Sequence, residues 1–271
     1  MLEQVIQPLI LGIVQGLGEF LPVSSTAHLI LAPYFFHWED PGLAFDVALH
    51  LGTLIALLAF FWRDWLCIFE LAFKNKVQSS RFKVQSYGNN ILWLIVAATI
   101  PGILAGYFLE NSAERSFRSP ILVALMLAVF GLFLYLTDKY SRGQKNLGQV
   151  SWRSAIFIGI AQAIAIIPGV SRSGITITGG LLAGLDRVSA ARFSFLLSTP
   201  IIFGAVIFKI TDLFESGMDK NILIGILAAA ISGYLAIKYL LKFIERVKYG
   251  IFFWYRLALA IVIIFSAIYF K

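Results

Sequence analysis

The sequence has few charged side chains: only 14% of its 271 residues are Asp, Glu, Lys or Arg. A soluble domain has about 25%, so this chain lacks the charge needed to cover a folded surface in water. It also has a single cysteine, Cys67, which excludes an internal disulfide bond and a metal cluster held by several cysteines. No basic leader precedes the first apolar residues, so we expect no removable signal peptide.

Long apolar runs dominate the chain instead, and 59% of its residues are hydrophobic. Six of these runs approach the length of about 20 residues that a helix needs to cross a bilayer. They cover residues 43–62, 91–109, 121–136, 193–210, 222–241 and 251–270. Because no soluble architecture buries six such runs together, the sequence predicts an all-α polytopic membrane protein with six transmembrane helices.

The net charge of +7 comes from short segments between the apolar runs, which is typical of membrane anchoring and argues against a nucleic-acid partner. The basic segments are 63–88, 138–153, 185–192 and 242–249, whereas 110–119 and 211–220 are neutral or acidic. Cytoplasmic loops carry an excess of Lys and Arg. We therefore expect the four basic segments in the cytoplasm, the other two outside, and both termini external.

Two further stretches, 5–36 and 154–184, are apolar at both ends and polar in the middle. Each half has about 10–15 residues, which is too short to cross a bilayer. We expect each stretch to be a re-entrant helix pair that turns at Pro22 or at Pro168, with the polar turn facing protein or a water-filled cavity.

The two stretches also resemble each other, since Gly-Ile-Val-Gln at 12–15 matches Gly-Ile-Ala-Gln at 159–162. Each copy, 1–137 and 154–271, would contain one re-entrant pair and three spans. Three is odd, so the second copy must be inverted relative to the first. We call the polar turn of each re-entrant pair, at Pro22 and at Pro168, a break. The sequence thus predicts a single membrane domain of inverted-topology repeats, with the functional site where the two breaks meet.

The residues of the two breaks favour phosphate binding. They are Gln15, Glu19, Ser24, Ser25, Thr26 and His28 in the first break, and Ser171, Arg172, Ser173 and Gly174 in the second. Serine and threonine after a proline are typical helix N-caps, and a helix N-terminus binds anions. The Arg172 guanidinium adds the fork that grips two phosphate oxygens.

Plainer roles remain open for these residues. The hydroxyls could be helix caps alone, Glu19 could be a structural partner of Arg172, and His28 could be only a hydrogen-bonding partner. We assign structural roles to Gln162, to Arg256, and to Gly180 with Gly184, which are spaced for close helix packing. His37 and His50 receive no role.

At this point the sequence resembles a known family. Gln15-Gly-Leu-Gly-Glu19-Phe-Leu-Pro22-Val-Ser-Ser-Thr-Ala-His28, followed by Pro168-Gly-Val-Ser-Arg-Ser-Gly174, is similar to the bacterial undecaprenyl-diphosphate phosphatases, also called bacitracin-resistance proteins. The resemblance covers essentially the whole chain. That family allows Glu or Gln at the first motif position, so with Gln15 here Glu19 is the only acidic residue of the motif.

The resemblance implies that a C55 isoprenoid diphosphate is cleaved to the monophosphate and inorganic phosphate, which recycles the lipid carrier for peptidoglycan synthesis and confers bacitracin resistance. It implies a location in the bacterial cytoplasmic (inner) membrane and a site open to its outer face. The partners would be the polyprenyl diphosphate and membrane lipids, and a homodimer remains open.

A mechanism follows as an expectation. Ser25 would attack the terminal phosphorus, His28 would transfer a proton, and Arg172 would hold the transferring group. The surrounding donors would be Gln15, Ser24, Thr26, Ser171, Ser173 and Gly174. A divalent cation, Mg²⁺ or Ca²⁺, would bind at Glu19 and neutralise charge on the diphosphate. Direct attack by water remains open, and so does a transporter or flippase for phosphate or polyprenyl phosphate, because inverted repeats with broken helices are also a transporter architecture.

Overall fold

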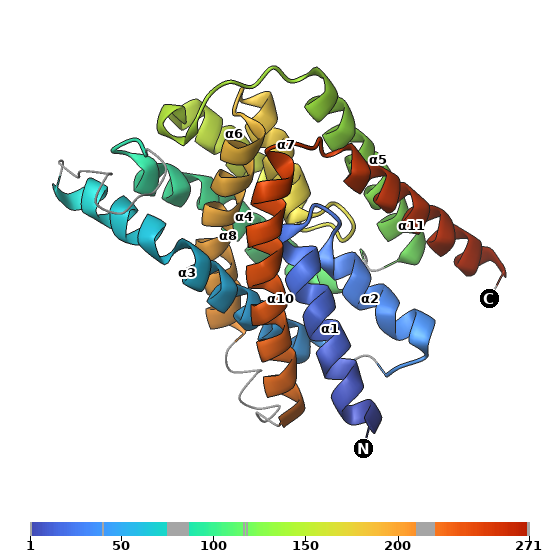
Figure 1. Cartoon of the computed structure of the whole chain (residues 1–271). Helices are drawn as coiled ribbons and strands as arrows, with labels where there is room; N and C mark the ends of the chain where they lie inside the picture. The colour runs from blue at the N-terminus through green and yellow to red at the C-terminus, as the bar shows by residue number, and fades with distance from the viewer. Residues whose placement is uncertain are drawn as a thin grey trace.

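A computed structural model describes residues 2–39, 41–74, 87–115, 117, 119–209 and 220–269. The described residues form an all-helical protein (Figure 1). The helices are α1 (Leu2–Phe20), α2 (Ser25–Phe36), α3 (Leu43–Lys74), α4 (Ile91–Arg115), α5 (Pro120–Tyr140), α6 (Trp152–Ile164), α7 (Arg172–Leu182), α8 (Arg187–Phe208), α10 (Lys220–Ile244) and α11 (Gly250–Tyr269), with a 3₁₀ turn η2 at Leu147–Gln149.

Six of these helices are long and apolar enough to cross a membrane, which confirms the six predicted runs. They are α3, α4, α5, α8, α10 and α11. The two predicted helix pairs are α1 with α2 and α6 with α7, and each helix of these pairs is too short or too polar to meet the same criterion. The chain is therefore a multi-pass membrane protein.

Several predicted loops are partly helical, among them the external loop 110–119, where α4 continues to Arg115. Residues 63–74, expected in a cytoplasmic loop, continue α3 beyond a kink at Phe61, because buried Cys67, Ile68 and Leu71 keep an apolar face against the core. Both arginines of segment 185–192 lie in the first turns of α8, whose N-terminus is capped by the Asp186 side chain. The remainder of segment 63–88 up to residue 86, and segment 211–220 apart from Lys220, lie outside the described residues.

The two helix pairs meet turn to turn in the middle of the molecule. Figure 1 shows α1 and α2 rising to the turn at 21–24 from one end, while α6 and α7 reach the turn at 165–171 from the other. The Ser173 hydroxyl of the second pair donates a hydrogen bond to the Leu21 carbonyl of the first, at 3.2 Å. The two breaks, nearly 150 positions apart in sequence, are thus in direct contact.

The first helix of each pair packs closely on one long helix. α1 lies along α10, where a Cβ added to Gly12 would come within 2.4 Å of the Gly225 carbonyl oxygen. α6 lies along α4, where a Cβ added to Gly159 would come within 2.5 Å of the Ala98 carbonyl oxygen. These glycines start the two matching tetrapeptides. Close helix approach therefore accounts for glycine at both positions. The second spaced pair differs: Gly180 packs against Ala190, but Gly184 has a φ of +89° and serves the turn after α7.

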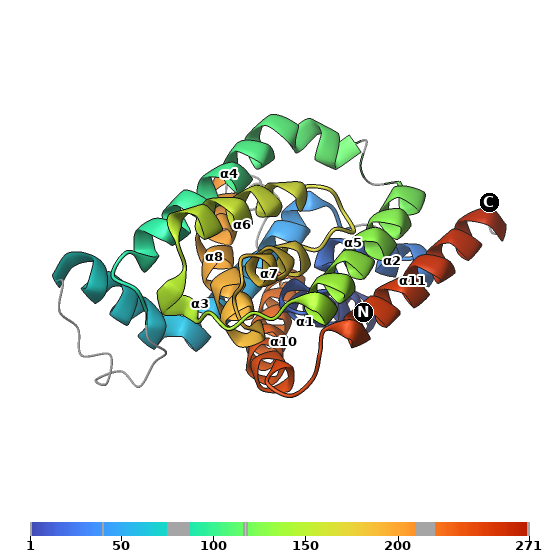
Figure 2. The same cartoon turned by 90° about the horizontal axis from the view of Figure 1, so that it is seen from above.

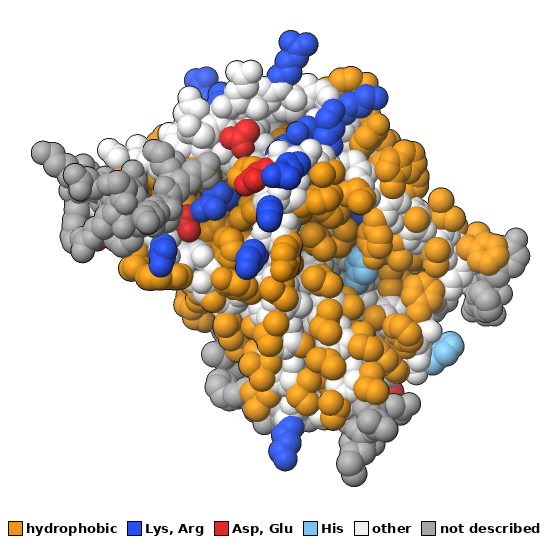
Figure 3. All heavy atoms as spheres, in the orientation of Figure 1, with side chains coloured by type: hydrophobic (Ala, Val, Ile, Leu, Met, Phe, Trp, Pro, Cys, Tyr) orange, Lys and Arg blue, Asp and Glu red, His pale blue; other side chains and the backbone are white. Residues whose placement is uncertain are grey.

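Positive charge gathers at one end of the molecule. Figures 2 and 3 show that the connections between α5 and α6 and between α10 and α11 lie at this end, which carries most of the Lys and Arg side chains. A buried network joins three helices here: Arg187 pairs with Asp138, and the Asp138 carboxylate accepts the Tyr249 backbone N–H at 2.9 Å. Burial, together with the Asp138 carboxylate, raises the pKa of Tyr249 well above its usual value, so its phenol stays protonated and donates to the Arg187 carbonyl.

Candidate active site

A cavity of about 510 Å³ lies where the two breaks meet. Its polar lining combines Glu19, Ser24, Ser25 and Thr26 from the first break with Ser171, Arg172 and Ser173 from the second. Its outer part is mostly apolar, with Ile103 and Tyr107 from α4 and Phe208 from α8, all largely exposed, and it also includes Lys209 at the end of α8. Seven of the ten predicted site residues therefore line one cavity, which joins polar groups at its inner end to an apolar mouth.

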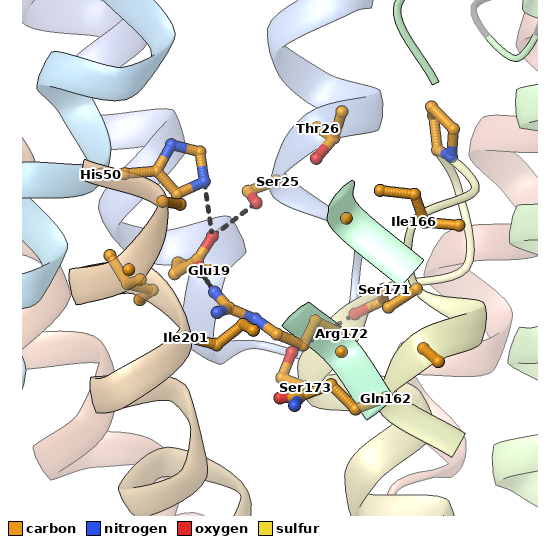
Figure 4. Close-up of a pocket in the computed structure, with 18 of the residues that line it drawn as sticks. Glu19, Ser25, Thr26, His50, Gln162, Ile166, Ser171, Arg172, Ser173 and Ile201 are labelled. Carbon is orange, nitrogen blue, oxygen red and sulfur yellow. Dashed lines mark hydrogen bonds and ion pairs between the residues drawn. The ribbon is translucent and has the colours of Figure 1, made fainter. Parts of the chain in front are cut away.

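The Glu19 carboxylate contacts polar side chains of both breaks at the inner end of the cavity (Figure 4). Its Oε2 accepts the Ser25 hydroxyl at 2.8 Å and the Gln15 amide nitrogen at 3.0 Å, while its Oε1 pairs with the Arg172 guanidinium. Glu19 is only 6% exposed. A buried carboxylate needs such partners to remain charged. One side chain thus ties the Ser25 hydroxyl of one break to the Arg172 cation of the other.

Ser24 and Ser171 hold the two outgoing helices in the same way. Both are N-caps with positive φ, 73° and 70°, and each hydroxyl accepts the backbone N–H three residues further on. Gly174, predicted to bind phosphate, does not line the cavity, and its N–H donates to the Ser171 hydroxyl instead. The N-termini of α2 and α7 both lie at the cavity, which makes its inner end electropositive.

Arg256 fastens both breaks from behind. It is 0% exposed and donates only to carbonyl oxygens: Nη1 to Pro22, Nη2 to Gly169 and Val170, and also to Met126 and Leu127 of α5. Among the described residues no carboxylate pairs with it. Arg256 therefore has a structural role, as expected, because it links the two turns. It also places a positive charge without a carboxylate partner behind the predicted phosphate-binding residues.

Comparison of the sequence with known proteins identifies the family of this chain. The family described as "Bacitracin resistance protein BacA" matches residues 8–262. The chain belongs to this family. Its relatives include an undecaprenyl-diphosphatase of Moorella thermoacetica, 50% identical over 260 residues, which are 96% of this chain and 97% of the relative. Another is the undecaprenyl-diphosphatase of Pelotomaculum thermopropionicum, 46% identical over 263 residues, 97% of each chain.

In this BacA-family chain, His28 does not reach the cavity that Ser25 lines. Its Nδ1 donates to the Ser24 carbonyl at 2.7 Å, so its Nε2 must accept the Tyr255 hydroxyl, at 2.6 Å. It lines a second cavity on the other side of the first break. Both ring nitrogens are engaged there, so proton transfer between His28 and Ser25 stays a prediction that this geometry does not favour.

His50, to which we assigned no role from the sequence, does line the cavity. Its Nε2 lies 3.7 Å from Glu19 Oε2, and its Nδ1 donates to the Asp46 carbonyl at 2.7 Å, so Nε2 is the nitrogen that faces the site. Figure 4 shows His50 and Ser25 approaching the Glu19 carboxylate from two helices. An ionisable residue within an apolar run indicates a functional site. His50 lies within the predicted run 43–62, so the sequence alone could have identified it as a candidate.

Two glutamines also differ from expectation. Gln15, predicted to bind phosphate, is fully buried behind Glu19 and does not line the cavity, whereas Gln162, predicted to be structural, does line it. The Oε1 atoms of both side chains are buried without a hydrogen-bond partner among the described residues. A buried amide oxygen without a partner is costly. Of the two side chains only Gln162 lines the cavity, so its Oε1 is the acceptor that a bound group could satisfy.

Proposed function

We propose that this protein hydrolyses undecaprenyl diphosphate to undecaprenyl phosphate and inorganic phosphate, which recycles the lipid carrier for peptidoglycan synthesis and confers bacitracin resistance. The observation that carries the proposal is the Ser25 hydroxyl, hydrogen-bonded to Glu19 beside Arg172, at the inner end of a cavity with an apolar mouth. A phosphate group fits the inner end and an isoprenoid chain fits the mouth. The names of the relatives cited above support the same reaction.

Ser25 is the nucleophile in this proposal. Its oxygen attacks the terminal phosphorus while the bond to the bridging oxygen breaks, and the lipid monophosphate leaves. The Ser25 proton passes along the existing 2.8 Å hydrogen bond to Glu19. Water then hydrolyses the phosphoserine, which releases inorganic phosphate and restores the serine. Arg172 and the N-termini of α2 and α7 stabilise the negative charge on the transferred group.

The donor set fits a hard divalent cation, Mg²⁺ or Ca²⁺. Glu19 would hold it, and the unpartnered Oε1 of Gln162 belongs to the lining of the same cavity. Among the described residues no three His, Cys, Asp or Glu side chains cluster to form a closed metal cage. Mg²⁺ typically takes one or two carboxylates and completes its shell with water and substrate phosphate. When bound, the cation would supply neutralising charge to the diphosphate.

The proposed orientation places the basic end of the molecule in the cytoplasm and both termini outside, in the bacterial cytoplasmic membrane. The α1–α2 pair would then be re-entrant from the outside and the α6–α7 pair from the cytoplasm, as inverted-topology repeats. The two equivalent N-caps support the repeat, as does the packing of α1 on α10 and of α6 on α4. The cavity mouth, near the C-terminal ends of α4 and α8, would open towards the outer face.

Phosphate release by purified protein tests the function. We expect release from a C55 diphosphate that falls on adding a chelator, recovers on adding Mg²⁺ or Ca²⁺, and weakens in Glu19→Gln in a way that excess metal partly restores. If the protein binds the lipid diphosphate but releases no phosphate with any divalent cation, the enzyme proposal fails. A transporter or flippase would then be the better reading.

Cysteine labelling tests the orientation in a Cys67→Ala background. A cysteine at position 145 should react with a membrane-impermeant reagent only after the cells are opened, because Lys145 lies at the basic end of the molecule. Labelling of that position in intact cells would contradict the inverted-repeat arrangement.

A further inference from the structure

A second cavity of about 820 Å³ lies between α1, α10 and α11. It exists because α10 packs on α1 and α3 while α11 packs on α5, so the two helices diverge from their short connection (Figure 1). Its walls are mostly apolar, and several of these side chains are exposed, among them Leu17 of α1 and Ile251 of α11. A cavity with such walls, in the part of the protein that faces lipid, is suited to a hydrocarbon chain.

One end of this cavity is positively charged. Lys242 and Arg246 line it and are exposed, and no Asp or Glu belongs to the lining. In the described part of the chain neither cation has a carboxylate partner within ion-pair distance. Figure 3 places this region at the basic end of the molecule, above an apolar surface. The cavity thus joins an apolar groove to a cationic rim.

The two cavities offer different chemistry. At its inner end the second cavity meets His28 and Tyr255, which already satisfy each other at 2.6 Å. It therefore has no free hydroxyl beside a carboxylate, unlike the cavity of Ser25. Gly18 lines both cavities, so its backbone lies between them. The backbone of Ser25 is packed closely against it, since a Cβ added to Gly18 would lie 2.9 Å from the Ser25 Cα. A ligand of the second cavity is thus bound rather than hydrolysed.

We propose that this second cavity binds an anionic phospholipid of the cytoplasmic leaflet. Its phosphate would lie between Lys242 and Arg246, and an acyl chain would run past Ile251 and Leu17 towards His28. Basic pockets between helices on the cytoplasmic side are suited to anionic lipid head groups. Lys242 and Arg246 together carry more positive charge than the single negative charge of a phosphodiester, so they attract it, and an acyl chain fits between the apolar walls. The inference depends on the orientation proposed above, but not on hydrolysis.

Lipid retention tests this site in the full-length protein. Native mass spectrometry from detergent, after addition of phosphatidylglycerol or phosphatidylcholine, should show a retained phosphatidylglycerol adduct and little phosphatidylcholine. The double variant Lys242→Gln/Arg246→Gln should weaken that adduct about thirtyfold, since each cation near a membrane surface contributes a factor of about five. The matched variant Arg153→Gln/Lys248→Gln removes one Lys and one Arg from the same end, outside the cavity, and should retain the lipid.

Two further variants separate the alternatives. Ile251→Trp fills the groove without changing charge and should weaken the adduct, whereas Glu19→Gln, in the other cavity, should keep it even when hydrolysis is lost. Equal losses in both double variants would mean a diffuse charge effect and overturn the proposal. Equal retention of phosphatidylcholine, or preferential retention of a polyprenyl monophosphate, would overturn it as well.

Discussion

The turns at 21–24 and at 165–171 end on a serine with nearly the same backbone, φ 73° at Ser24 and 70° at Ser171, and each serine caps the helix that follows. The next residue differs: Ser25 begins α2, whereas Arg172 begins α7. The entering helices differ too, because Glu19 of α1 has no acidic counterpart in α6. The two breaks thus share one kind of turn but divide the polar groups of the cavity, with Glu19 and Ser25 on the first break and Arg172 on the second.

This division has a physical reason. A diphosphate carries several negative charges, and a single helix N-terminus offers only a partial positive charge. In the proposed mechanism the two N-termini and Arg172 would together hold the anion, while Glu19, which accepts the Ser25 hydroxyl, would keep that hydroxyl oriented. If both breaks carried arginine there would be no nucleophile, and if both carried glutamate the anion would be repelled. Substitutions that affect one break and not the other can test this view.

The largest effect is expected at Ser25. Ser25→Ala should lower kcat by about 10³-fold or more while leaving the affinity for the lipid diphosphate almost unchanged, because a nucleophile contributes to chemistry and not to ground-state binding. Phosphate release and lipid binding should be measured in the same detergent. Ser119→Ala, at an exposed serine outside the cavity whose side chain caps no backbone N–H, is the control and should retain most turnover. If Ser25→Ala keeps more than about a tenth of wild-type turnover, water attacks directly and Ser25 only binds.

The second largest effect is expected at Arg172, in the second break. Arg172→Lys keeps the charge but loses the planar fork, so we expect kcat/KM to fall by about 100-fold. The same variant should also weaken the binding of inorganic phosphate, which reports on the anion site without any turnover. Arg153→Lys, at an exposed arginine, is the control for the substitution itself. Unchanged kcat/KM in Arg172→Lys would mean that Arg172 only neutralises Glu19.

Arg256 links the two breaks, so its loss should affect stability. Arg256→Met leaves carbonyl groups of both turns without a donor, and we expect the free energy of unfolding to fall by about 3 kcal/mol. Thermal unfolding in detergent would measure this, with Arg153→Met changing stability by less than about 0.5 kcal/mol. A stability close to wild type in Arg256→Met would show that the turns hold their shape without this clamp.

The smallest effects compare the two caps directly. Ser24→Ala and Ser171→Ala should each cost about 1 kcal/mol of stability, because each removes the hydroxyl that caps the following helix. Ser24→Gly and Ser171→Gly should cost less, since glycine accepts that backbone without strain. Equal costs at the two positions would support duplicated scaffolds. A cost at one position more than about 1 kcal/mol above the other would show that the breaks are not equivalent.

Much of this protein follows from its sequence alone. The lengths of the apolar runs predict six helices that can cross a membrane, because a helix in lipid must satisfy its own backbone over a fixed thickness. Pro22 and Pro168 mark the two breaks, and Ser24 and Ser171 cap the helices that follow, because proline and the capping hydroxyls act through the local backbone. These features depend on residues close together in the chain.

Only the tertiary structure decided which side chains meet. The sequence favoured His28 over His50 because His28 is close to Ser25 along the chain, yet packing turns His28 towards Tyr255 and brings His50 to Glu19. Arg256 reaches Pro22 across 234 positions, and no local pattern marks that contact. Partners of this kind are set by how distant helices pack, and that packing depends on the shape of every side chain between them.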